Sequence, residues 1–118
     1  MNAPNERLAA LAAVLGEEET RELVRIFLRT APRMVADVAL EDHSEARRAA
    51  HSLKSSSLQM GLMDLSKQAL EIEKRFDTGG GPPSATDYTL LQARARRAEG
   101  ALREYAGPDT TPPPASAL

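Results

Sequence analysis

The sequence predicts an all-α fold, an antiparallel four-helix bundle with a short N-terminal capping helix. Apolar residues recur at spacings of three and four in five segments, and no segment shows the sustained alternation that indicates a strand. Four of these segments are long enough to bury their apolar stripes against one another. Because 118 residues suit a single core, we expect one domain over residues 1–106 and a disordered Pro-rich tail over residues 107–118.

The first two predicted helices differ in length. The short one ends at Gly16, which accepts a left-handed conformation, and its apolar face holds Leu8, Leu11, Ala12 and Leu15. The longer one runs from about residue 18 to residue 40 and carries a stripe of Val24, Phe27, Ala31, Met34 and Val38. Because a proline removes a helical hydrogen bond, Pro32 predicts a kink or a local break in this second helix.

The third and fourth predicted helices form an antiparallel hairpin. Asp42, with Glu45 three residues on, caps the third helix. Its inward face holds Ala46, Ala50, Leu53, Ser57 and Met60. Gly61 is the turn into the fourth helix, whose apolar face holds Leu62, Leu65, Ala69, Ile72 and Phe76.

The last predicted helix follows a loop over residues 77–83 that is rich in glycine and proline. Ser84 and Asp87 form its cap, and Gly107-Pro108 ends it. Its apolar face holds Tyr88, Leu91, Ala95, Ala98, Leu102 and Tyr105.

Composition excludes several classes of function. A net charge of -2 and the presence of only two Phe, two Tyr and no Trp argue against nucleic-acid binding. The absence of cysteine excludes disulfides, thiolate metal sites and a cysteine nucleophile, and it fits a cytoplasmic location. We identify neither a signal peptide nor a membrane span.

One histidine is the candidate functional residue. His51 lies about 100° from Ala50 on the helix, toward water, and Lys54 and Ser55 share its face. A neutral imidazole is a nucleophile near neutral pH, so a ring nitrogen can accept a phosphoryl group. Lys54 can supply part of the positive charge that such a transfer needs.

The residues around His51 are expected to receive a partner. Arg47 and Arg48 add a longer-range attraction for an acidic pocket, although from position alone they also fit an ordinary solvated face. Ser55 is small enough for a partner to approach the ring. Leu58, one heptad after the histidine, is an apolar residue on the wet face and is interpreted as a partner contact.

Other titratable residues do not form a site by their spacing. His43 is expected to be a solvated first-turn residue, and it is too far along the helix from His51 for both to bind one metal ion. Glu71 and Glu73 diverge on their helix, so they do not form a carboxylate pair for acid–base chemistry.

The stretch from Ala50 to Gly61, AHSLKSSSLQMG, resembles the signature of histidine-containing phosphotransfer (HPt) domains, approximately A-H-x-L-K-G-S-[SA]-x-x-[LM]-G. Phe27-Leu28 with Pro32 is similar to the F-L-x-x-x-P segment of that family, and the resemblance extends over roughly residues 6 to 105. Ser55 is the departure, because the family usually has glycine there.

The resemblance implies a bundle without kinase activity that carries a phosphoryl group on His51 to or from the aspartate of response-regulator receiver domains, or between a receiver and a histidine kinase. Mg²⁺ would belong to the partner receiver, so no cofactor is expected in this chain, and a monomer is expected. Lys54 would give electrostatic assistance, Gln59 a polar contact near the partner, and Gly61 the turn that closes the site.

Two alternatives stay open. A bundle of this kind that is not phosphorylated could bind and inhibit or scaffold a kinase or receiver, and Ser55 is the support for that hypothesis. The chain could also be a plain helical adaptor or oligomerisation bundle with an incidental histidine. The intact His51 and Lys54 argue against both alternatives.

Overall fold

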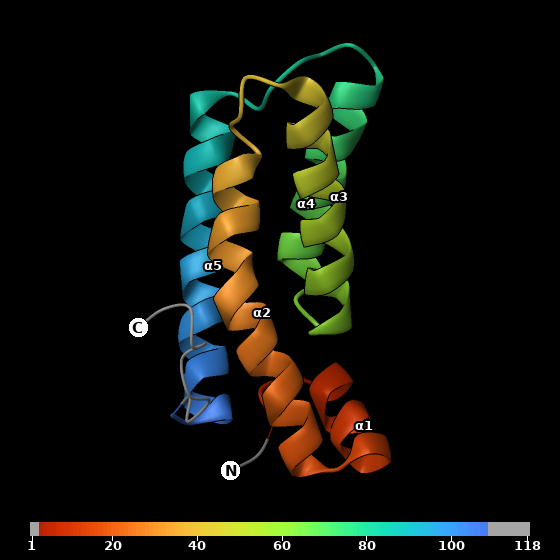
Figure 1. Ribbon diagram of the computed structural model, residues 1–118, viewed down its shortest axis with the longest axis vertical. Coiled ribbons are helices and arrows are strands. Elements are labelled where there is room, and N and C mark those ends of the chain that lie inside the picture. The colour runs from red at the N-terminus through yellow and green to blue at the C-terminus, as the bar shows by residue number, and fades with distance from the viewer. Residues whose placement is uncertain (1–2, 109–118) are drawn as a thin grey trace, which may run out of the picture.

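The computed structural model describes residues 3–108 as helices joined by short connections, with no strand in that part of the chain. The all-α prediction is therefore confirmed. The helices are α1 (Glu6–Leu15), α2 (Glu17–Asp37), α3 (His43–Gln59), α4 (Met63–Asp77) and α5 (Ala85–Ala106). Figure 1 shows α2, α3, α4 and α5 along the long axis of the molecule, with α1 at its lower end. The tail predicted to be disordered lies, from residue 109 on, outside the described residues.

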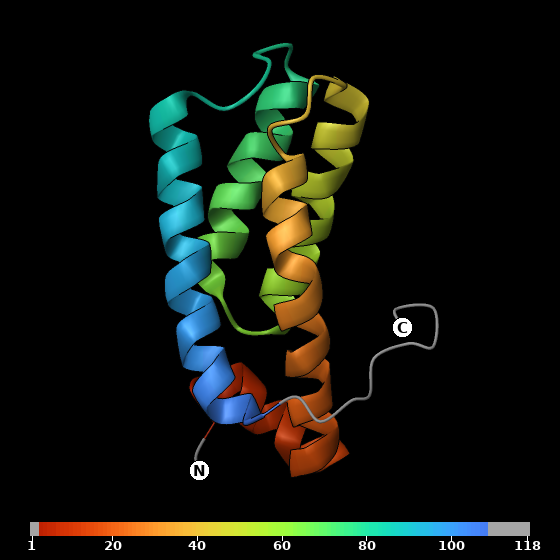
Figure 2. The same ribbon diagram turned by 60° about the vertical axis from the view of Figure 1, so that its left-hand side comes forward.

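Each of the four long helices packs against two others. α3 packs against α2 and α4, and α5 packs against α2 and α4. Figure 2 shows α3 running toward the lower end and α4 returning beside it. The turn between them depends on Gly61, whose φ of +77° favours glycine. None of the helices in residues 3–108 has the length and apolar character needed to cross a membrane.

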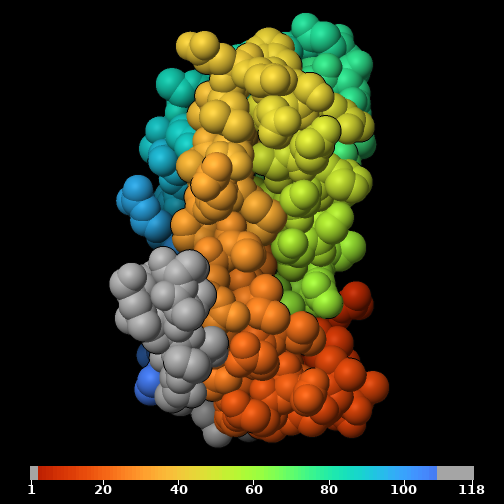
Figure 3. Space-filling view, in the orientation of Figure 1, coloured from red at the N-terminus to blue at the C-terminus, as the bar shows by residue number. Residues whose placement is uncertain are grey.

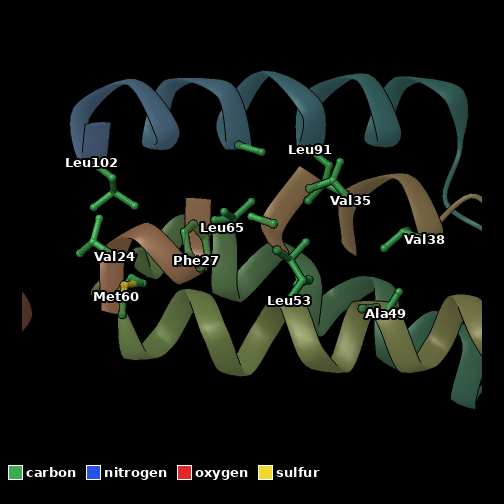
Figure 4. Packing of buried hydrophobic residues seen from close by; sticks show 14 of the residues in the cluster. Val24, Phe27, Val35, Val38, Ala49, Leu53, Met60, Leu65, Leu91 and Leu102 are labelled. Atoms are coloured by element: carbon green, nitrogen blue, oxygen red, sulfur yellow. The ribbon is translucent and has the colours of Figure 1, made fainter. Parts of the chain in front are cut away.

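The core consists largely of the apolar faces that the sequence predicts, but Leu15, on the predicted face of α1, is 43% exposed and lies outside it. Figure 4 shows core side chains meeting between the helices. On α3 every predicted inward residue is buried, including Ser57. Met34, Leu62, Phe76 and Tyr88 lie only partly buried at the edge of the core. The buried hydrophobic residues of the other helices include Leu8, Val24, Phe27, Ala31, Val35, Val38, Leu65, Ala69, Ile72, Leu91, Ala95, Leu102 and Tyr105.

The helix ends follow the predicted capping residues. The Asp42 carboxylate accepts hydrogen bonds from the backbone N–H groups of Ser44 and Glu45, and the Ser84 hydroxyl accepts one from Asp87 at 3.1 Å. Side-chain oxygens at these positions satisfy N–H groups that have no partner within the helix. Asp42, nine residues before His51, thereby fixes the start of α3 at His43.

The predicted local break at Pro32 is wrong. α2 continues as one helix from Glu17 to Asp37 with Pro32 inside it. Pro32 is exposed, whereas Ala31 and Val35 are buried in the core. Packing of the buried face of α2 therefore maintains the helix across the missing hydrogen bond, because tertiary burial contributes more to helix stability than local propensity does.

Candidate functional site

His51 projects from the middle of α3 on the side away from the core. Its side chain is 54% exposed, while Ala50 and Leu53 beside it are fully buried. The 3.6-residue period of the helix produces this division, because neighbours along the chain point about 100° apart. Figure 3 shows the outer surface of α3 lying open beside that of α2.

A buried carboxylate on α4 is hydrogen-bonded to the imidazole of His51. Glu73 Oε2 lies 2.6 Å from His51 Nδ1, and the Glu73 side chain is only 7% exposed. A carboxylate accepts hydrogen bonds, so in the neutral ring Nδ1 carries the proton and donates a hydrogen bond to Glu73 Oε2. The lone pair of the neutral ring then lies on Nε2, which is the nitrogen available for chemistry.

Lys54 completes this cluster. Its ammonium Nζ donates to Glu73 Oε1 at 2.9 Å and lies 3.3 Å from His51 Nδ1. Burial raises the pKa of Glu73, but the hydrogen bonds from Lys54 and His51 outweigh burial, so this pKa lies below its ordinary value. Glu73 is therefore ionised at neutral pH, and it fixes the positions of both the ring and the ammonium group.

Arg47 and Arg48 differ in their surroundings although they are adjacent in sequence. Arg47 Nε donates to Asp77 at the end of α4, and Arg47 Nη2 lies 3.8 Å from Glu73 Oε2. The hydrogen bond from Arg47 holds the pKa of Asp77 below its usual range. Arg48 instead lies 3.7 Å from Glu45, with its side chain 73% exposed. Only the first arginine thus belongs to the His51 cluster.

The remaining predicted site residues lie on α3 after His51 or in the turn that follows α3. Ser55 and Gln59 are exposed, and Leu58 is 44% exposed. Gly61 lies in the α3–α4 turn, where a Cβ would collide with the Asn5 side chain. Asn5 also donates from Nδ2 to Met60 O at 2.9 Å, so the segment before α1 supports the end of α3.

Sequence reasoning missed Glu73 as a site residue. The prediction that Glu71 and Glu73 diverge is confirmed, since Glu71 is exposed and Glu73 is buried. The missed signal is that Glu73 follows Ala69 by four residues, which puts it within about 40° of the apolar stripe of α4. A carboxylate on a buried face needs cationic or N–H partners, and the α3–α4 hairpin supplies them.

The other histidine has no such surroundings. His43 begins α3 and is exposed, and its ring centroid lies 5.5 Å from that of Phe76. Within residues 3–108, no three His, Asp or Glu side chains gather into a group that could hold a metal ion.

The site is therefore an exposed imidazole on a helical bundle, with one ring nitrogen hydrogen-bonded to a buried carboxylate and two cations beside that carboxylate. A family model described as the Hpt domain matches residues 22–105, and the chain belongs to that family. Domains of this family act in histidine phosphotransfer in phosphorelays, where they interact with receiver domains and kinases. The match begins within α2, so α1 lies outside it. No curated protein and no solved structure matches the chain.

Proposed function

We propose that this protein is a histidine phosphotransfer protein of a two-component phosphorelay, which carries a phosphoryl group on Nε2 of His51 to or from the aspartate of a response-regulator receiver domain. The observation that carries the proposal is the exposed imidazole whose Nδ1 lies 2.6 Å from the Glu73 carboxylate, in a chain of the Hpt family. We also propose that α2 to α5 form an antiparallel four-helix bundle and that α1 caps this bundle.

The transfer step needs no proton to enter or leave the site. The Nε2 lone pair attacks the phosphorus of the partner's aspartyl phosphate, an N–P bond forms, and the P–O bond breaks with its electron pair on the departing carboxylate. The Nδ1 proton stays in place, so the ring becomes cationic beside the Glu73 carboxylate. In the reverse direction the ring leaves as a neutral imidazole, with its proton still on Nδ1.

Residues around the ring assist this step by charge and by shape. Lys54 supplies positive charge near the developing phosphoryl charge, because transfer depends mainly on positioning and electrostatic stabilisation. We propose that Ser55 leaves space for the partner, that Leu58 and Gln59 contact it, and that Arg47 and Arg48 attract its acidic pocket. The phosphoryl group comes from the partner, which also holds Mg²⁺, so the chain acts as a carrier without kinase activity of its own.

The test is to mix the protein with phosphorylated receiver domains and Mg²⁺, and to look for acid-labile, alkali-stable label on the bundle. We expect label on the wild type and on His43→Gln, and none on His51→Gln. His43→Gln is the matched control, because it removes the other histidine of the same helix.

Two outcomes would contradict the carrier function. One is the absence of label with every receiver and kinase tested, and the other is equal label on wild type and His51→Gln. Binding of a receiver or kinase without label would favour the non-phosphorylated scaffold, the hypothesis that Ser55 supports.

A further inference from the structure

Two cations flank His51 on the same face of α3, one turn to either side. Arg47 precedes the histidine by four residues and Lys54 follows it by three, which are the spacings that bring side chains together on a helix. Arg47 Nη2 lies 3.8 Å from Glu73 Oε2, the same oxygen that lies 2.6 Å from His51 Nδ1. The guanidinium group therefore approaches the Glu73 oxygen that holds the Nδ1 side of the ring.

The two cations are held differently. Lys54 is bonded at 2.9 Å to Glu73, whose side chain is 7% exposed, and is itself 25% exposed. Arg47 is bonded to Asp77 at the surface, where the two side chains are 47% and 46% exposed. Ion pairs in water are weak, since both groups remain hydrated and screened. Arg47 can therefore exchange its partner, whereas Lys54 is fixed by a buried carboxylate.

We propose that Arg47 binds the phosphoryl group when His51 carries it, and that Asp77 holds the Arg47 guanidinium until then. The inference rests on the proposed phosphotransfer function and adds to it a residue that contacts the transferred group. A phosphoryl group carries more negative charge and more acceptor oxygens than a carboxylate, and guanidinium matches its geometry with two parallel hydrogen bonds. The phosphoryl group thus displaces Asp77 as the partner of Arg47.

The test uses phosphoramidate, a small phosphoryl donor that needs no partner protein. Nε2 of His51 attacks its phosphorus, the N–P bond to the ring forms, and the P–N bond of the donor breaks with its electron pair on the departing ammonia. We expect Arg47→Gln to lower the initial rate of labelling about fivefold, and Asp77→Asn to raise it about twofold by freeing the guanidinium.

An exposed pair on α2 supplies matched controls. Arg33→Gln and Asp37→Asn make the same charge changes at residues that pair with each other at 3.1 Å, and each is expected to leave the rate within about twofold. In the Arg47→Gln background, Asp77→Asn should have no further effect, because Asp77 acts through Arg47. On phosphorylation, the ¹⁵N-detected Nε–H resonance of Arg47 should move and that of Arg33 should not.

The possible outcomes distinguish a failure of the role of Arg47 from a failure of the proposed phosphotransfer function. If the wild type takes no label on His51, the proposed function fails and the inference fails with it. If the wild type is labelled but Arg47→Gln behaves as Arg33→Gln does, only the role of Arg47 is overturned. An equal acceleration by Asp77→Asn with and without Arg47 would show that Asp77 acts as a general charge and would also overturn it.

Discussion

His51 acquires its proposed chemistry from a residue that is distant in the sequence. The imidazole and Lys54 lie on α3, but Glu73 on α4 determines which ring nitrogen is protonated, at 2.6 Å from Nδ1. The sequence could predict the exposure of His51 and the proximity of Lys54, since both follow from helical spacing. It could not predict the contact with Glu73, because that contact depends on the register between two helices.

Replacing Glu73 should slow phosphorylation of His51. Glu73→Ala removes the acceptor for Nδ1–H, so we expect initial labelling by phosphoramidate to fall about tenfold, the effect of losing one hydrogen bond to a charged group. Glu73→Gln keeps an acceptor oxygen but no charge, and it should lose less. Glu71→Gln, an exposed neighbour on the same helix, should match the wild type. Equal rates for Glu73→Ala and the wild type would contradict the assigned geometry.

Glu73 should also make folding stability depend on acid pH. Its pKa is lower in the folded protein than in the unfolded chain, because Lys54 and His51 outweigh its burial. A depressed pKa contributes stability above the unfolded value, about 4.3, and this contribution is lost as the pH falls through the folded pKa. Urea unfolding should therefore show that the stability difference between wild type and Glu73→Gln is constant above about pH 5 and shrinks below pH 4. A difference independent of pH would contradict this.

At the scale of elements, the α3–α4 hairpin and its turn place the site. The capping residue Asp42, the inward faces and the turn at Gly61 are all local signals, and the structure agrees with each of them. The local break that Pro32 could have caused is absent, because burial of Ala31 and Val35 on the same helix outweighs the lost hydrogen bond. The contact of Asn5 with the turn was not predictable, because it joins residues 55 positions apart.

Two glycines should respond in opposite ways to substitution by alanine. Gly61→Ala should lower the free energy of unfolding by about 1–2 kcal/mol or more, because φ is +77° and a Cβ would collide with Asn5. Gly100→Ala, inside α5 with open space around it, should raise that free energy by about 0.5–1 kcal/mol. Urea unfolding of both variants measures this. Destabilisation by Gly100→Ala equal to that by Gly61→Ala would show that the turn geometry is not the cause.

For the molecule as a whole, the bundle separates a core that sets the fold from surfaces that carry function. Periodicity predicted most of the core, because burial of apolar stripes is a general property of amphipathic helices, but it missed the buried Val35 and Ala49. Periodicity was not enough to identify which exposed apolar residues meet a partner. Leu58 and Leu90 are 44% and 43% exposed. They differ in position, because Leu58 lies on α3 with His51 and Leu90 lies on α5.

This difference in position predicts different effects when an aspartate replaces each leucine. Leu58→Asp should weaken binding of a receiver domain at least about fivefold, because it places a charge in the proposed contact surface. Leu90→Asp, on a helix that packs against α2 and α4 rather than α3, should bind as the wild type does. Calorimetry with one receiver measures both affinities. Equal weakening by the two variants would show that the partner does not dock around His51.

The position of the phosphoryl group tests the proposed function most directly. The protein, uniformly labelled with ¹⁵N and phosphorylated by a receiver domain, should show coupling between phosphorus and Nε2 of His51 in its NMR spectra. Nδ1 should keep its proton and its hydrogen bond to Glu73, which is 2.6 Å long in the free protein. Phosphorus bound to Nδ1, or phosphate found on any residue other than His51, would contradict the proposed mechanism.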